Sequence, residues 1–202
     1  MTQTITGLYD SYADAKAAVE ALEAAGVPHG DVSIIASDAA GEHGAAHGLD
    51  PVADDAGKGA GVGAALGGAG GLLAGIGFLA IPGLGPVVAA GWLAATAVGA
   101  VGGAVIGGAA GGIVGALTKE GVPEADAHVY AEGVRRGGSL VSARVNDDLA
   151  DTARSILSDE RAVDVQARSE RYRGEGWSRF DESAPVYTPE EALAERGRYG
   201  GV

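Results

Sequence analysis

TITGLYDSYADAKAAVEALEAAGVPHGDVSIIA, residues 4–36, has the pattern of one strand–helix–strand unit. Thr4 to Tyr9 and Asp31 to Ala36 favour strands. Between them Ser11 and Asp14 form a capping pair, and Gly26 ends a stretch in which apolar residues recur at helical spacing. Those recurring residues are Ala17, Ala18, Leu22 and Ala25. The stretch therefore predicts a βαβ unit.

A second unit with the same order follows later in the chain. Ser139 to Val145 (SLVSARV) alternates as a strand, and Asn146 to Asp148 caps a helix that continues through Ala153, Ile156 and Leu157. Ala162 to Ala167 (AVDVQA) then predicts a closing strand. Two βαβ units that share one antiparallel sheet form a ferredoxin-like split βαβ sandwich of the α+β class. A further helix is expected from Glu124 to Arg136, where Arg135 and Arg136 would complement the helix dipole.

An uncharged block separates the two units. Gly59 to Thr118 is 60 consecutive residues without Asp, Glu, Lys, Arg or His, and it holds 20 of the 36 glycines. A glycine every four residues on a helix gives a face on which two backbones can approach closely. We therefore expect an inserted glycine-zipper helical hairpin, with helices over 59–80 and 87–118 and a turn at Pro82, Gly83, Gly85 and Pro86. The helix-packing residues would be Gly59, Gly63, Gly67, Gly71, Gly75, Gly99, Gly103, Gly107, Gly111 and Gly115.

The lengths of these two segments are compatible with a membrane hairpin. As helices they would measure about 33 and 48 Å, against a hydrocarbon core of about 30 Å. Lys58 and Lys119 flank the open end, which predicts that the α+β domain lies on the cytoplasmic side of the cytoplasmic membrane. MTQTITGLYD lacks the features of a secretory signal, so we expect no export by that route. The alternative is a cytoplasmic protein whose hairpin is buried in a homo-oligomer or against the sheet, so the expected partner is a lipid bilayer or the chain itself.

Charge and residue types argue against several functions. The chain has 27 acidic and 14 basic side chains, a net charge of −13, and no cysteine, and only Lys16 and Lys58 are basic in the first 118 residues. A nucleic-acid partner is therefore not expected. His43 and His47, with Asp50 nearby, are the minimum for a transition-metal site, but their Gly- and Ala-rich surroundings favour a loop. Since no catalytic constellation is found, the sequence predicts no enzyme, no cofactor and no metal.

Residues 168–202 differ in composition from the rest. They contain five of the ten aromatic residues among balanced charges, and no period of a strand or helix is sustained. We expect a largely disordered C-terminal tail, with a protein partner docked through its aromatic side chains as the alternative. The predicted organisation is a first βαβ half with an acidic loop (1–58), the hairpin (59–118), a helix with the second βαβ half (119–167) and the tail (168–202). The five aromatics are Tyr172, Trp177, Phe180, Tyr187 and Tyr199.

Several motifs resemble those of one known family. LAIPGLGP at 79–86 precedes GVPE at 121–124 and YAEGVRRGG at 130–138. Together with residues 4–36, this order resembles the bacterial general stress protein 17M-like family, which includes low-temperature-induced and heat-induced proteins, over residues 4 to about 167. The resemblance implies a role in stress responses and no catalytic activity or cofactor.

We therefore predict a noncatalytic general stress-response protein that associates with the membrane or self-assembles through the glycine-zipper hairpin. The alternative is a soluble oligomeric sensor that binds a small ligand through its ferredoxin-like domain, at a sheet edge or a dimer interface.

Overall fold

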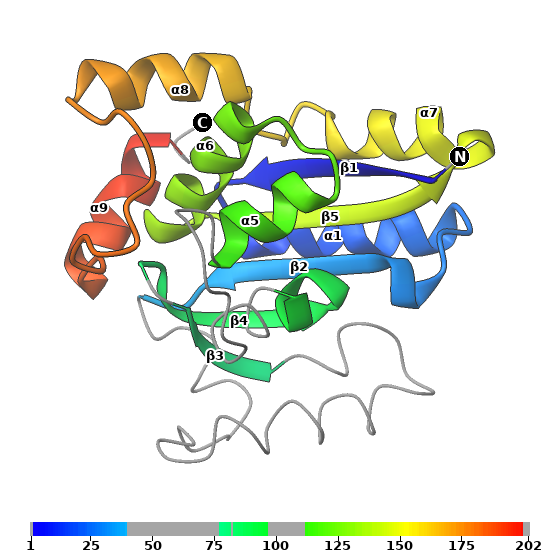
Figure 1. Cartoon of the computed structure of the whole chain (residues 1–202), viewed down its shortest axis with the longest axis horizontal. Coiled ribbons are helices and arrows are strands. Elements are labelled where there is room, and N and C mark those ends of the chain that lie inside the picture. The colour runs from blue at the N-terminus through cyan, green and yellow to red at the C-terminus, as the bar shows by residue number, and fades with distance from the viewer. Residues whose placement is uncertain (1, 40–76, 82, 97–111, 200–202) are drawn as a thin grey trace.

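The computed structural model describes residues 2–39, 77–81, 83–96 and 112–199, and these form an α+β structure (Figure 1). A five-stranded antiparallel sheet has the order β1-β5-β2-β4-β3, with helices on both faces. The elements are β1 (Thr2–Tyr9), α1 (Tyr12–Ala24), η1 (His29–Asp31), β2 (Val32–Ser37), β3 (Gly77–Ile81), β4 (Gly85–Gly91), α5 (Gly112–Lys119), α6 (Glu124–Arg135), β5 (Ser139–Asn146), α7 (Asp147–Leu157), α8 (Val165–Gly174) and α9 (Pro189–Tyr199).

The first βαβ unit is confirmed. The Ser11 hydroxyl accepts a hydrogen bond from the Asp14 N–H at 3.1 Å and caps α1, and Gly26 follows the helix with a φ of 94°. β1 and β2 are both antiparallel to β5, which lies between them, so they run parallel to each other. The strands, the helix and the spacing that the sequence predicts for residues 4–36 are therefore those of a split βαβ unit.

The second unit is confirmed only in part. β5, α7 and α6 form where the sequence predicts them. The predicted closing strand Ala162–Ala167 is wrong, because only Ala162 bridges to β1, opposite Tyr9, and α8 begins at Val165. Asp164 is the physical reason: its side chain accepts from the Ala167 N–H at 2.9 Å and starts a helix there. Where the sequence predicts a closing strand beside β1, the structure therefore has a single bridge.

On both sides of its turn, the predicted helical hairpin consists of strands, β3 and β4, instead of helices. β3 and β4 pair with each other, and β4 pairs with β2, so residues 77–80 and 87–91 extend the sheet and the helices predicted there are wrong. β4 contains a run of buried apolar residues, Val87 to Ala90, which suits an interior strand. The turn is placed correctly, since the Leu84 N–H donates to the Ile81 carbonyl at 3.0 Å and Gly83 has a φ of 76°. Pro82 lies outside the described residues.

Most of the predicted helix-packing glycines lie in parts of the chain outside the described residues. Gly115 lies in α5, while the other predicted packing glycines lie outside the described residues: Gly59, Gly63, Gly67, Gly71, Gly75, Gly99, Gly103, Gly107 and Gly111. Within the described ranges, no helix combines the length and the apolar character that crossing a bilayer requires.

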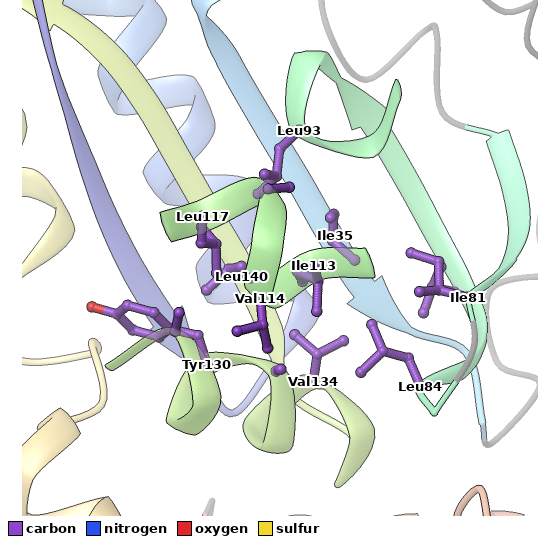
Figure 2. Packing of buried hydrophobic residues seen from close by; sticks show 14 of the residues in the cluster. Ile35, Ile81, Leu84, Leu93, Ile113, Val114, Leu117, Tyr130, Val134 and Leu140 are labelled. Atoms are coloured by element: carbon purple, nitrogen blue, oxygen red, sulfur yellow. The ribbon is translucent and has the colours of Figure 1, made fainter. Parts of the chain in front are cut away.

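Two hydrophobic clusters sit on opposite faces of the sheet. α1 and α7 cover one face, where Val19, Leu22 and Leu157 belong to the same cluster as Val141 of β5. α5 and α6 cover the other face (Figure 2). There the labelled side chains from these helices, from β2 and β5, from the β3–β4 hairpin and from the helical turn after β4 form one packed group: Ile35, Ile81, Leu84, Leu93, Ile113, Val114, Leu117, Tyr130, Val134 and Leu140.

The prediction of a disordered tail is also wrong. Residues 165–174 and 189–199 form α8 and α9, and Tyr172, Phe180 and Ala192 are buried. Gly83 and Gly85 of the β3–β4 turn touch this segment, because a Cβ on Gly83 would lie 2.6 Å from the Cα of Glu182 and one on Gly85 would lie 3.2 Å from Val186. Tyr172 and Phe180 of this segment are therefore part of the folded domain.

Candidate functional site

β1 forms one edge of the sheet, and the pairing of this edge stops early. The Leu8 carbonyl accepts a hydrogen bond from the Val163 N–H at 2.8 Å, and no further rung follows among the described residues. Backbone groups alternate in direction along an antiparallel strand, so Thr6 and Thr4 point to the same outer edge as Leu8. The edge therefore presents a row of backbone donors and acceptors beyond the bridge.

Tyr130 occupies the first position of that row. Its hydroxyl donates to the Thr6 carbonyl at 3.2 Å, where the N–H of a neighbouring strand would otherwise donate. The ring comes from α6 and lies at the margin of the cluster in Figure 2, with the hydroxyl directed away from it. Burial, with a smaller contribution from the nearby carboxylate of Asp126, raises the pKa of Tyr130 to about 12. A side chain thus satisfies a backbone acceptor of the sheet edge.

A groove of about 470 Å³ lies over this edge. β1 contributes one side, α6 contributes Asp126 and Tyr130, and the end of α7 and the start of α8 complete it. Its described lining includes two carboxylates, Asp126 and Asp164, and no Lys, Arg or His. The full lining is Thr6, Gly7, Leu8, Asp126, Tyr130, Leu157, Ser158, Ala162, Val163, Asp164, Val165 and Gln166. The groove combines an acidic character with apolar walls and an open strand edge.

A largely buried network, here called the tail clasp, holds α8 and α9 against α6. It consists of Glu132, Arg136, Tyr172, Glu175 and Glu195. Arg136 donates to Glu132, Glu175 and Glu195 at 2.7, 2.5 and 2.7 Å, and its guanidinium lies 4.0 Å from the centre of the Tyr172 ring. Burial disfavours the charge of Arg136, but the hydrogen bonds to Glu132 and Glu175 outweigh this effect and raise the pKa of Arg136. The tail clasp therefore joins α6, α8 and α9, whose contact no pattern in the sequence predicts.

A second contact fixes the start of α8. Arg168 makes a two-pronged ion pair with Asp10, at 2.8 and 2.7 Å, and Asp10 directly follows β1. Arg168 is buried, and such paired, planar contacts are stronger than single ones. This ion pair therefore holds the first turn of α8 against the end of β1, beside the groove.

The sequence identified none of the groove residues as a site. Tyr130 stands in the motif YAEGVRRGG, but its spacing alone does not indicate a hydrogen bond to Thr6, which is 124 residues away. The candidate metal residues His43, His47 and Asp50 lie outside the described residues. In the part of the chain that the structure describes, no three His, Cys, Asp or Glu residues are grouped to hold a metal.

The buried tyrosines predict a loss of stability at high pH. Burial raises the pKa of Tyr130 and of Tyr172 to about 12, above the usual value of 10. The unfolded chain therefore loses these protons first, and the free energy of unfolding should fall between pH 10 and 12 and stay unaffected by these groups below pH 10. Urea unfolding at pH 9, 10 and 11 measures this. Tyr130→Phe should reduce the slope by up to one proton, about 1.4 kcal/mol per pH unit, and an unchanged slope would contradict the assignment.

Comparisons of the chain with protein-family models, with curated proteins and with solved structures gave no match. The resemblance to general stress proteins therefore stays a prediction that rests on the motifs quoted above.

Proposed function

We propose that this chain is a noncatalytic binding protein that takes up an extended polypeptide segment with basic and apolar side chains along the open edge of β1. The observation that carries the proposal is the edge itself. The Val163 N–H donates to the Leu8 carbonyl, and no further strand pairing follows along this edge among the described residues. The next outward carbonyl, that of Thr6, accepts instead from the Tyr130 hydroxyl beside the groove. Addition of a strand to such an edge is a common mode of peptide recognition.

The register of the bridge specifies how the segment would lie. An antiparallel segment that continues the pairing of Val163 with Leu8 exchanges backbone hydrogen bonds with Thr6 and then with Thr4. Side chains alternate between the two faces of a sheet, so the residue opposite Thr6 points toward α6 and the residue opposite Ile5 points toward α7. The first direction leads to Asp126, and the second leads to the apolar end of α7 at Leu157.

Charge favours a basic residue opposite Thr6. Asp126 is partly buried and lies in the groove lining, and the whole chain has a net charge of −13. An opposite charge next to a partly buried carboxylate is favourable, and the overall charge attracts a basic segment over a longer distance. The segment is therefore expected to carry Lys or Arg at this position and apolar residues at its neighbours.

This proposal keeps the expectation of a ligand bound at a sheet edge by the α+β domain and changes the class of ligand. A row of backbone donors and acceptors at regular spacing matches another polypeptide backbone better than it matches a compact small molecule. Self-assembly or membrane association through the glycine block depends on residues outside the described ranges, and it stays a prediction, as does the role in stress responses.

A short peptide tests the proposal. Acetyl-Lys-Val-Thr-Val-Thr-amide, with its lysine opposite Thr6, should perturb the amide resonances of Thr4 and Thr6 when titrated into the protein. The same peptide with a methyl group on the backbone nitrogen of the lysine lacks the donor for the Thr6 carbonyl. It should bind at least about fivefold more weakly. Asp126→Asn should weaken binding of the unmethylated peptide by a similar factor, since one charge-assisted contact is lost.

Asp151→Asn is the matched control. Asp151 lies on α7 with its side chain exposed, so this substitution removes the same charge at a position away from the groove. It should leave the dissociation constant within a factor of two. Equal binding of the two peptides, or perturbations confined to residues away from β1, would refute strand addition at this edge.

A further inference from the structure

We infer that residues 164–167 can leave α8 and extend the bridge into an additional strand on the outer edge of β1. In that state they would compete with the proposed peptide for the same edge. This inference concerns the regulation of the site proposed above, but its tests need no added peptide. It predicts two states, one with the tail docked and the edge open, and one with the tail released and the edge filled.

The chain already begins this strand. Ala162 bridges Tyr9, and the Val163 N–H donates to the Leu8 carbonyl. In the same register Val165 lies opposite Thr6 and Ala167 lies opposite Thr4, and the Val165 N–H reaches the carbonyl that Tyr130 now satisfies. The sequence AVDVQA at 162–167 alternates as a strand does, which is why the sequence alone predicts one there.

The groove provides the space for it. Its lining includes both partners of the missing ladder, Thr6 to Leu8 on β1 and Ala162 to Gln166 on the competing segment. No other described strand lies beyond β1 on this side of the sheet. Among the described residues, the Tyr130 hydroxyl occupies the Thr6 carbonyl on this edge, and the segment would displace it.

The docked tail prevents this pairing. In the extended register Arg168 would lie opposite Gln3, about 23 Å along the strand from the position next to Asp10. The ion pair between Arg168 and Asp10 and the burial of Tyr172 in the tail clasp are then impossible. Docking of the tail and filling of the edge exclude each other, so whatever releases the tail closes the peptide site, and a bound peptide favours the docked tail.

Proline at position 165 separates the two states. Val165 is the first residue of α8, a position where proline is favoured, and Asp164 before it has φ −68° and ψ 110°, which proline tolerates in a preceding residue. Proline has no N–H for the Thr6 carbonyl, so Val165→Pro permits the helix and forbids the strand. This variant is the matched control for any change that releases the tail.

Amide exchange in the full chain tests the inference. Arg168→Ala, which removes the ion pair with Asp10, should slow exchange of the Thr6 amide at least tenfold, because the Thr6 N–H gains the Val165 carbonyl as acceptor. Arg168→Ala combined with Val165→Pro should return the Thr6 amide to the exchange rate of the parent chain. Equal exchange of Thr6 in the single and the double variant would overturn the inference.

An engineered disulfide provides a second readout. The chain has no cysteine, and in the filled state Ile5 and Gln166 form a close, non-hydrogen-bonded pair. Ile5→Cys with Gln166→Cys should therefore oxidise at least tenfold faster when Arg168→Ala is added, and Val165→Pro should suppress this gain. No acceleration would reject the second state. Cross-linking without any peptide binding to the parent chain would retain the competing strand and reject the proposed function instead.

Discussion

Replacing Arg136 by methionine is expected to lower the free energy of unfolding by about 3 kcal/mol, because two buried carboxylates each lose one of their cationic partners. Glu132 is fully buried and Glu195 is nearly so, and Arg136 donates to both. Arg135 stays with Glu132 and Arg198 stays with Glu195, which places the loss at the lower end of the range for broken buried pairs. In a chain of this size we expect the melting temperature to fall by roughly 6–12 °C.

Arg154→Met is the matched control. Arg154 pairs with Asp151 at 2.6 Å, but both side chains are at least half exposed, and such surface pairs contribute less than about 1 kcal/mol. Urea and thermal unfolding of both variants measure the difference. If Arg136→Met loses no more stability than Arg154→Met, the tail clasp does not stabilise the fold. Amides near Trp177 and Phe180 should also lose protection before those of β5, because α8 and α9 are held through the clasp.

The tail shows why composition alone predicted disorder there. Its charges are balanced and its aromatics are spaced without a period, which is the pattern of a solvated segment. The partners that order it lie elsewhere in the chain: Glu175 and Glu195 reach Arg136, and Arg168 reaches Asp10, 158 residues away. Arg136 itself has the sequence context of a helix-terminal cation. Only the fold brings these charges together and removes them from water.

The first βαβ unit could be predicted because its signals are local. Ser11 caps a helix within three residues, Gly26 ends it, and the apolar, β-branched residues of β2 fit a strand that is buried throughout. Residues 162–167 have an equally good local signal and yet turn into a helix after two residues. The difference is the capping by Asp164 and the ion pair of Arg168, which together favour α8 over a fourth strand.

The candidate site could not be predicted, because no motif encodes it. It arises where β1 becomes an edge, where α6 brings Tyr130 over that edge, and where the chain leaves β1 after Val163. Each of these depends on the order of strands in the sheet. The sequence of β1 does not indicate that its outer edge is open, since the same residues would also fit a β1 that is paired with the predicted strand at 162–167.

Replacing Gly91 by alanine is expected to lower the free energy of unfolding by about 3 kcal/mol or more, through the sheet rather than through a helix interface. Gly91 ends β4 with a φ of 89°, a conformation that costs an L-residue roughly 1–2 kcal/mol. A Cβ there would lie 2.3 Å from the Val32 carbonyl oxygen and 2.8 Å from the Cα of Ser33, so β2 would have to move.

Gly91 is not one of the predicted helix-packing glycines, although it lies within the predicted second helix (87–118), and the structure gives it a different role. In a helical hairpin a glycine lets two helices approach, whereas Gly91 lets β4 turn beside the backbone of β2. Gly174→Ala is the control, since a Cβ on Gly174 meets nothing within 4 Å, and alanine there should be neutral or add up to about 1 kcal/mol. Urea unfolding compares the two variants. A loss of stability for Gly91→Ala no larger than that for Gly174→Ala would mean that residues 87–91 do not pair with β2, and would favour the predicted helix for this part of the block.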